Sequence, residues 1–396
     1  MKAKRGPLGD ERRGRGPELP PTRSVLITGG LVRVSGAAAV GCGALFGLLP
    51  VLALIGRLGL PDDPPGFVPV FGGPLIAAAL GIAVFLIVLG YALTFHQLAL
   101  AGMYAPAEDS SALRNAVEVR GPVTRTPFFP AVVTSIVFGF LLLATASILL
   151  AASAWPTVAI TLLLSGVFCV PAVLALIAAD RRWSRTAPER LPARALGEQG
   201  SAQLLLRDAD TELRQQVKAR ERAEATELDH ATTPVLVTLA IASLAMMSPS
   251  LSPTAAIWRQ AQLVGVGLGV LCLLVLLGIR VLRIRRLRRT LVRVHRGGAD
   301  VTDIDRAHAI TATTTQASEL HAATTVWALL GTAALGTVVH RTADVAPVLI
   351  AAGIWALGFA VLIALSIRSD AAAPKLREEF GYRLPTKTSG NDNTWH

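Results

Sequence analysis

Residues 74–95 read PLIAAALGIAVFLIVLGYALTF and contain no charged side chain. An α-helix needs about 20 mostly apolar residues to cross the hydrocarbon core of a bilayer, so this stretch predicts a transmembrane helix. The composition of the whole chain agrees: 52% of its 396 residues are hydrophobic and 16% are charged, whereas a typical soluble domain carries about 25% charged residues. These values exclude a disordered chain, a nucleic-acid-binding module and an ordinary soluble enzyme as the whole protein.

Seven more stretches have a similar length and apolar character. The sequence therefore predicts an all-α, polytopic membrane helix bundle with about eight transmembrane helices arranged as four hairpins. The fifth stretch is the least apolar, because Pro249 and Pro253 end it early. The eight predicted spans cover residues 36–55, 74–95, 129–152, 157–179, 231–251, 262–279, 322–339 and 346–367.

The distribution of Lys and Arg predicts the orientation. All but Arg57, Arg259 and Arg341 of the 38 basic residues fall in the tails and in the loops on one side of the predicted spans. Loops rich in Lys and Arg stay in the cytoplasm. We therefore expect both termini to be cytoplasmic and the protein to be multi-pass in the cell (plasma) membrane. The large shares of Arg, Ala and Gly hint at a bacterial genome rich in GC.

The spans and the segments between them divide the chain into five parts. A basic N-terminal segment, rich in Gly and Pro, has too little apolar surface to fold alone. Strong helix formers within 201–228 predict a charged helix in the central loop. The predicted parts are a disordered cytoplasmic tail (1–35), a first four-helix transmembrane half (36–179), a cytoplasmic loop (180–230), a second four-helix half (231–367) and a cytoplasmic tail (368–396).

Two short stretches suggest an internal repeat. Residues 227–233 read ELDHATT and residues 319–325 read ELHAATT, and each opens or immediately precedes a predicted span. A duplication of hairpins in the same orientation would resemble the parallel repeats of some transporters. A chance match in a chain rich in Ala, Leu and Thr is the alternative, and the sequence leaves both open.

Motifs that carry catalysis are missing from the sequence. It contains neither a phosphate-binding glycine loop nor a serine-hydrolase elbow. Asp303, Asp305 and His308 could together ligate a divalent cation, but the surrounding arginines favour a solvated acidic turn that balances charge. We predict that the chain is not an enzyme, and we predict no catalytic residue, cofactor or metal ligand. The three cysteines stand one each in separate spans, where small packing residues are expected: Cys42, Cys169 and Cys272.

The eight predicted spans contain no ionisable residue. Charged groups at membrane depth mark proton and ion pathways, so coupling through intramembrane carboxylates is not expected. Serines and threonines in the spans are expected to form hydrogen bonds across helices, and Trp355 is expected to pack between helices. Two G-x-x-x-G patterns, at 43–47 and 265–269, predict close helix packing inside the bundle, with oligomerisation as the alternative.

Residues 280–296 predict a basic helix next to the membrane. Apolar residues recur there at steps of three and four, and no acidic residue interrupts them. Such a helix would contact anionic lipid headgroups; a solvated segment that only fixes orientation is the alternative. The candidate lipid contacts are Arg280, Arg283, Arg285, Arg286, Arg288, Arg289, Arg293 and Arg296.

Three functions from different classes fit these features. The leading hypothesis is a transport-type protein, either a permease subunit or a carrier of an apolar or small solute. The alternative is a membrane scaffold or accessory protein that transports nothing, favoured by the absence of charge in the spans. A membrane-embedded lipid enzyme would need His230, His321 and the cluster at 303–308 to converge. The expected partners are the bilayer, including anionic lipids, and a cytoplasmic or membrane protein, but no nucleic acid.

Overall fold

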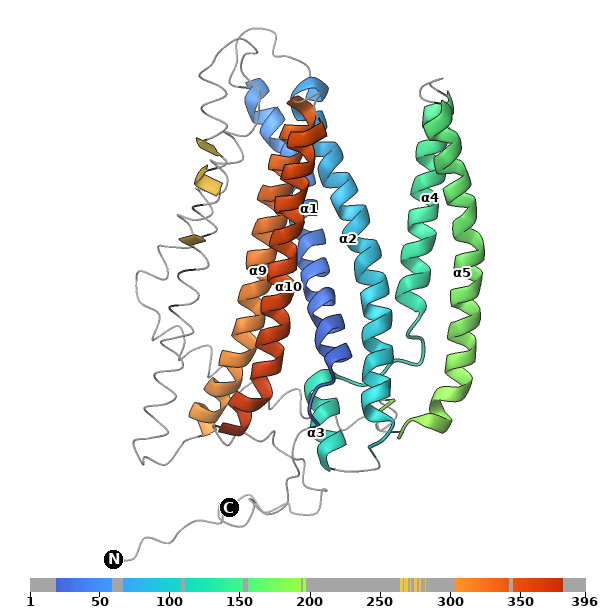
Figure 1. The fold of residues 1–396 in the computed structure, drawn as a ribbon, viewed down its shortest axis with the longest axis vertical. Helices are drawn as coiled ribbons and strands as arrows, with labels where there is room; N and C mark the ends of the chain where they lie inside the picture. The colour runs from blue at the N-terminus through green and yellow to red at the C-terminus, as the bar shows by residue number, and fades with distance from the viewer. Residues whose placement is uncertain are drawn as a thin grey trace, which may run out of the picture.

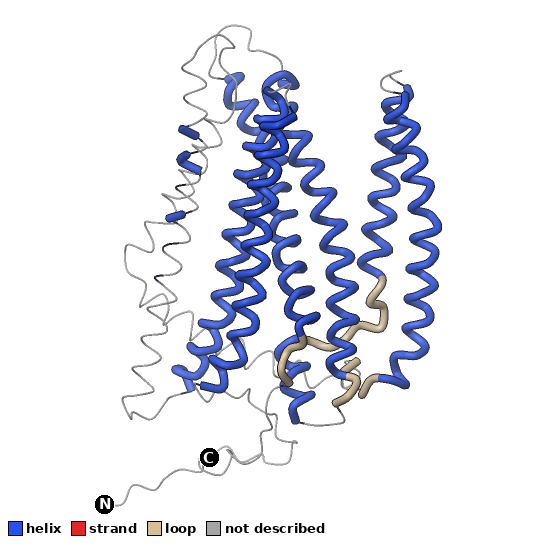
Figure 2. The backbone as a smooth tube through the Cα atoms, viewed as in Figure 1, coloured by secondary structure: helices blue, strands red, loops and turns tan. Residues whose placement is uncertain are grey.

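The structure is a computed structural model of the full chain. It describes residues 19–58, 67–107, 111–151, 156–193, 195–196, 303–341 and 345–379, together with separate positions between 264 and 282. All regular secondary structure in these residues is helical (Figure 2). The helices are α1 (Arg23–Leu58), α2 (Phe67–Tyr104), α3 (Ser111–Arg120), α4 (Phe129–Ala151), α5 (Pro156–Arg190), α9 (Asp303–Arg341) and α10 (Val345–Glu379).

Six of these helices are long and apolar enough to cross a membrane, counted over the described residues alone: α1, α2, α4, α5, α9 and α10. They match six of the eight predicted spans, and the chain is accordingly a multi-pass membrane protein. The predicted fifth span, 231–251, lies outside the described residues. Only scattered helical positions are described in the sixth, so the expected total of eight helices and the expected four hairpins stay predictions.

The helices extend beyond the predicted spans, and at the end where α1 begins these extensions are polar. The N-terminal tail was expected to reach residue 35, but α1 begins at Arg23; Val25 is buried there, and its backbone N–H lies 3.4 Å from the Thr22 hydroxyl oxygen, which caps the helix. Likewise α2 continues past Phe95 to Tyr104. Hydropathy marks only the apolar part of a helix, and these polar continuations are amphipathic segments that pack on other protein.

The arrangement has two parts (Figure 1). Helices α1 and α2 pack against each other and against α9, while α10 packs on α9 and α1; these four form the four-helix bundle. Helices α4 and α5 pack as a pair and reach the bundle through a contact between α4 and α2. The start of α1, the end of α10 and helix α3 lie at the same end, which we call the α3 end.

Glycine allows the backbones to approach closely inside the four-helix bundle. A Cβ atom built on Gly41 of α1 would lie 2.3 Å from the carbonyl oxygen of Thr325 in α9, and one built on Gly336 of α9 would lie 2.5 Å from the Cα atom of Pro74 in α2. Real Cβ atoms do not approach other atoms this closely, so both contacts require glycine. Small residues at the interface are the usual means of helix association in lipid.

The two G-x-x-x-G patterns behave differently. Gly265 and Gly269 are buried, as packing within the chain predicts. A Cβ atom on Gly43 or Gly47 would meet no atom within 4 Å, so the expected intramolecular role is wrong for the pattern in α1. The α1 glycine that contacts a neighbouring helix is Gly41, two residues away and on another side of the helix.

Tryptophan and glycine alternate across the contact between α9 and α10. The Trp327 indole of α9 lies against Gly358 of α10, and the Trp355 indole of α10 lies against Gly331 of α9. Trp327 Nε1 also donates to the carbonyl oxygen of Trp355 at 3.1 Å. Trp355 makes a ring contact with Phe85 of α2, so its expected role as a packing residue between helices is confirmed.

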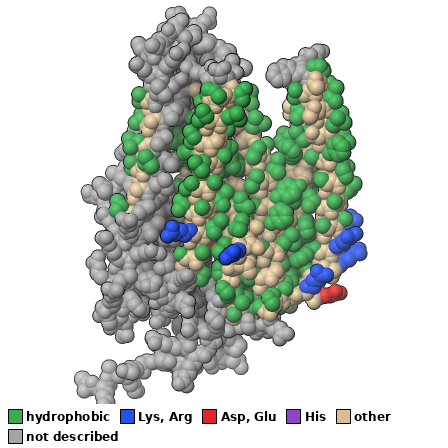
Figure 3. Space-filling view, in the orientation of Figure 1, with side chains coloured by type: hydrophobic (Ala, Val, Ile, Leu, Met, Phe, Trp, Pro, Cys, Tyr) green, Lys and Arg blue, Asp and Glu red, His purple; other side chains and the backbone are tan. Residues whose placement is uncertain are grey.

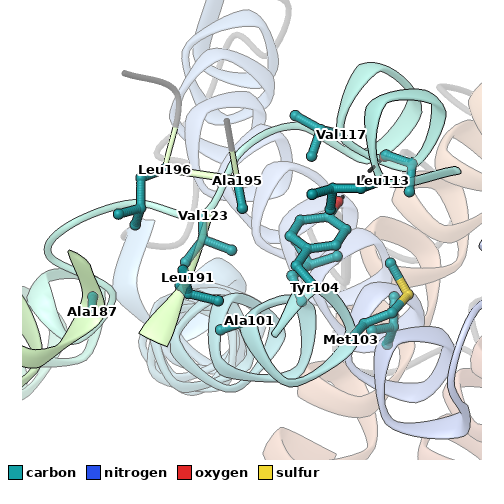
Figure 4. Close-up of a cluster of buried hydrophobic side chains, with 13 residues drawn as sticks. Ala101, Met103, Tyr104, Leu113, Val117, Val123, Ala187, Leu191, Ala195 and Leu196 are labelled. Atoms are coloured by element: carbon teal, nitrogen blue, oxygen red, sulfur yellow. Dashed lines mark hydrogen bonds between the residues drawn. The ribbon is translucent and has the colours of Figure 1, made fainter. Parts of the chain in front are cut away.

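A second hydrophobic cluster closes the α3 end. Fully buried Tyr104 lies beside Leu113 of α3 (Figure 4), and its hydroxyl group donates to the carbonyl oxygens of Ala116 (3.3 Å) and Gly121 (3.2 Å). Gly121 has φ +83°, the left-handed conformation that ends a helix. The cluster consists of Val25, Leu100, Ala101, Met103, Tyr104, Leu113, Ala116, Val117, Val123, Ala187, Leu191, Ala195 and Leu196.

Replacing Gly358 by Ala should destabilise the protein, because the new methyl group would lie 2.2 Å from the Trp327 ring. Overpacking of this kind costs about 1–3 kcal/mol. Gly353→Ala, also on α10, is the matched control, since a Cβ atom there meets nothing within 4 Å. Thermal unfolding in detergent should show a lower midpoint for Gly358→Ala alone; equal midpoints for both variants would contradict the packing described.

Candidate functional site

Polar side chains from three helices meet near the α3 end of the four-helix bundle. Thr28 and Arg33 come from α1, His96 from α2 and Asp370 from α10. We call these four residues the polar junction. His96 directly follows the predicted second span, while Arg33 and Asp370 lie three residues outside the first and last predicted spans. The three helices converge here because α1 carries Gly29 and Gly30, which present no side chain to their neighbours.

A hydrogen-bond contact between Thr28 and His96 connects α1 with α2. The Thr28 hydroxyl lies 2.7 Å from the carbonyl oxygen of Ser24, to which it donates. The same hydroxyl oxygen lies 3.0 Å from His96 Nδ1, which is within hydrogen-bond distance.

Arg33 and Asp370 form an ion pair that joins the first described helix to the last. The Arg33 side chain is 38% exposed and that of Asp370 is 17% exposed, so water screens the pair only in part. Space for it comes from the α1 backbone: a Cβ atom on Gly29 would lie 3.8 Å from Asp370 Oδ2, and one on Gly30 would lie 3.1 Å from Ile367 Cγ1.

The junction connects α1, α2 and α10 through side chains at one end of the four-helix bundle. Its Asp370 carboxylate is engaged by Arg33, and its Thr28 hydroxyl lies beside the His96 ring. Among the described side chains, no group of three or more His, Cys, Asp or Glu residues could hold a metal ion. Farther along the four-helix bundle, the interior is filled by apolar residues such as Leu45, Leu330 and Phe359.

A wedge-shaped groove separates the four-helix bundle from the pair α4–α5. The two parts touch at Gly90 of α2, where an added Cβ atom would lie 2.3 Å from Thr134 Oγ1 of α4. Beside this point, the Tyr91 hydroxyl and Ser135 Oγ are 2.9 Å apart. Away from the α3 end, α2 and α4 diverge, and the space-filling view is hollowed between them (Figure 3).

Apolar residues line the two walls of this wedge. Starting from Gly90, steps of three and four residues along the same side of α2 lead to Ala83, Ala79 and Ile76; Ile76 is 62% exposed. The corresponding steps from Thr134 along α4 lead to Phe138, Leu141 and Thr145. The wedge therefore presents hydrocarbon surface, with the hydrogen bond between Tyr91 and Ser135 at its closed end.

Most of the described Ser and Thr hydroxyl groups that were expected to form hydrogen bonds across helices instead bond within their own helix. In five residues the hydroxyl group donates to the carbonyl oxygen four residues earlier, a hydrogen bond that needs no partner helix. Ser135 and Thr332 do make contacts across helices, to Tyr91 and to Cys42 at 3.5 Å. The back-bonded residues are Thr134, Thr145, Ser147, Thr161 and Ser165; Thr238 and Ser243 lie outside the described residues.

The structure leaves most of the predicted site residues untested. The candidate lipid contacts Arg280–296 and His230 lie outside the described residues. Residues 303–308 form the start of α9 rather than a turn. Acidic residues there are favourable at a helix N-terminus, but their side chains lie outside the described set. His321 is exposed on α9. Cys42 is buried and Cys169 is half-buried at helix contacts, as expected for packing residues.

The polar junction was not predicted from the sequence, because its four residues lie just outside the apolar spans. Arg33 and His96 stand out as polar residues next to two different spans, but their proximity depends on which helices pack together. Helix α3 was also missed. Its Leu113, Ala116 and Val117 have helical spacing, which could have predicted it.

No protein family, curated protein sequence or solved structure matches this chain.

Breaking the ion pair should loosen the contact between α1 and α10. Arg33→Gln and Asp370→Asn should each lower the free energy of unfolding, and the double variant should lose less than the sum of the two, with a coupling of about 1 kcal/mol. Arg368→Gln, at an exposed position of α10, is the control and should be neutral. Additive losses in a double-mutant cycle, measured by denaturant unfolding in detergent micelles, would show that the pair contributes nothing.

Proposed function

We propose that this chain is a transport-type protein of the bacterial plasma membrane, either a permease subunit or a carrier of an apolar or small solute. The wedge between α2 and α4 is the observation that carries the proposal. Its walls are apolar, and it is hollowed away from the α3 end (Figure 3). In this proposal the wedge opens to the bilayer. A solute with a hydrocarbon part would enter it sideways from the lipid.

The contact at the closed end of the wedge suits a hinge. The parts meet there through Gly90 and Thr134 and through the hydrogen bond between Tyr91 and Ser135. Together with the hydrophobic cluster at the α3 end, which includes Ala187 of α5, this contact attaches the pair α4–α5 to the bundle at that end, so the pair could change its angle at the other end. The bundle meanwhile keeps its shape, because the ion pair and the aromatic cluster around Trp355 hold it.

The orientation in this proposal places the α3 end in the cytoplasm. Basic side chains of the described residues gather toward that end (Figure 3), in agreement with the positive-inside rule. A cytoplasmic protein partner would then meet α3 and the ends of α5 and α10. The proposal assigns no catalytic residue and no cofactor, and the absence of ionisable residues from the predicted spans favours a passive carrier or a subunit driven by a partner.

A scaffold or accessory protein that transports nothing is the second candidate. The close-packed interior of the four-helix bundle favours it. The described residues there form two clusters of buried apolar side chains, one containing Leu49 and the other containing Phe359. In that case the wedge would hold lipid or a helix of a partner protein. The two candidates differ in whether filling the wedge changes a flux.

Ala79→Trp should block transport, because an indole at this exposed position on the α2 wall fills the wedge. The test uses proteoliposomes with a panel of small solutes and of fluorescently labelled amphiphiles that cross protein-free bilayers slowly. We expect flux of at least one panel member above that of protein-free vesicles, and a decrease of about tenfold or more in the variant, equivalent to about 1.4 kcal/mol or more.

Leu357→Trp is the matched control. Leu357 is 65% exposed on α10, so the same substitution there adds an indole to a lipid-facing surface away from the wedge and should leave flux unchanged. If every panel member crosses no faster than in protein-free vesicles, the transport proposal fails and the scaffold is favoured.

A further inference from the structure

Helix α5 is the span least covered by protein. Only 6% of its most apolar window is buried within the described part of the chain, and α4 is its main helical neighbour. In a bilayer, lipid therefore surrounds most of its surface. The same helix continues beyond its apolar part to Arg190 at the α3 end.

One side of α5 changes from apolar to basic along its length. Val167, Pro171 and Leu174 are exposed on this side, followed two turns later by Arg181 and Arg185. These positions are separated by steps of three, four and seven residues, which return to the same side of a helix with 3.6 residues per turn. Arg182, also exposed, lies next to them, and basic side chains are visible at this end of α5 in Figure 3.

The spacing along this strip matches a single leaflet. At 1.5 Å per residue, Val167 and Arg181 are about 21 Å apart along the axis, and half of a bilayer's hydrocarbon core measures about 15 Å. A lipid whose tails lie along Val167 and Leu174 would therefore have its phosphate group at the height of Arg181 and Arg185.

Packing fixes the orientation of these arginines. Trp183 packs against the hydrophobic cluster at the α3 end, and Ala187 is part of that cluster. Asp180 accepts a hydrogen bond from the backbone N–H of Phe128 at 3.0 Å, so this carboxylate is already engaged. In the part of the chain that the structure describes, the side chains of Arg181, Arg182 and Arg185 take part in no ion pair and no hydrogen bond.

We propose that Arg181, Arg182 and Arg185 form a binding site for the phosphate group of an anionic phospholipid, whose tails lie along α5. Guanidinium groups bind phosphate through paired hydrogen bonds, and a strip that is apolar and then basic matches the order of tail and headgroup. This site is formed by residues of α5 other than the arginines of 280–296, and it does not depend on transport activity. An acidic segment of a partner protein would meet the charges but would leave the apolar strip unused.

Native mass spectrometry of the full-length protein tests the site. The protein is released from micelles that contain equal amounts of phosphatidylglycerol and phosphatidylcholine. We expect the wild type to retain phosphatidylglycerol preferentially, and Arg181→Gln/Arg185→Gln to retain about tenfold less, since each basic residue near a membrane surface contributes favourably to anionic lipid binding. Arg182 and Arg190 remain in this variant, so the positive end of α5 that directs its insertion is kept.

Three comparisons decide the result. Arg23→Gln/Arg368→Gln, which removes two exposed arginines at the same end of α1 and α10, should retain phosphatidylglycerol like the wild type. Higher salt should release phosphatidylglycerol but not phosphatidylcholine from the wild type, a readout that needs no variant to fold. Equal retention of both lipids, or equal loss in both double variants, would overturn the proposal; release by inorganic phosphate at millimolar concentration would show a phosphate site without a lipid.

Discussion

Close approach between helix backbones, made possible by glycine, is the constraint on which the rest of this structure depends. Apolar side chains gain little by moving from lipid to another helix, so association in a membrane depends on packing and on hydrogen bonds between helices. Gly41 and Gly336 bring α1 and α2 into backbone contact with α9, and Gly331 and Gly358 seat the two tryptophans between α9 and α10. These four positions set how closely α1, α2 and α10 pack around α9.

The two ends of the molecule are built differently, and the difference gives the wedge its shape. At the α3 end, Tyr104 fixes α3 beneath the bundle, and the N–H of Val123 donates to the carbonyl oxygen of Ala195 at 2.8 Å. These contacts connect the segments before α4 and after α5 to the bundle. Toward the other end, α4 and α5 contact mainly each other, which leaves α2 and α4 free to diverge.

The sequence was informative where one physical rule decides the outcome. Six spans followed from apolar length, because the membrane requires about 20 such residues, and the packing role of Trp355 followed from its place inside a span. Helix ends were predicted poorly at the α3 end, since Arg23, Tyr104 and Arg190 lie in polar continuations that hydropathy does not detect.

Contacts between distant parts of the chain could not be read from the sequence. The ion pair between Arg33 and Asp370 joins residues near opposite ends of the chain. The residues around either one do not indicate which distant residue is its partner. The G-x-x-x-G pattern at Gly43 was misleading for a related reason: spacing shows that two glycines share a side of a helix, but not whether a neighbour lies there. The partner of each surface is a property of the assembled bundle.

Under the proposed function, the pair α4–α5 moves against a bundle that keeps its shape. Spin-label distances in lipid nanodiscs test this directly, in a variant whose three cysteines are replaced by alanine. Labels at Ile76 and Leu141 report across the wedge, and labels at Ile76 and Leu349 of α10 report within the bundle. The account predicts a broad distance distribution across the wedge and a narrow one within the bundle; two equally narrow distributions would contradict it.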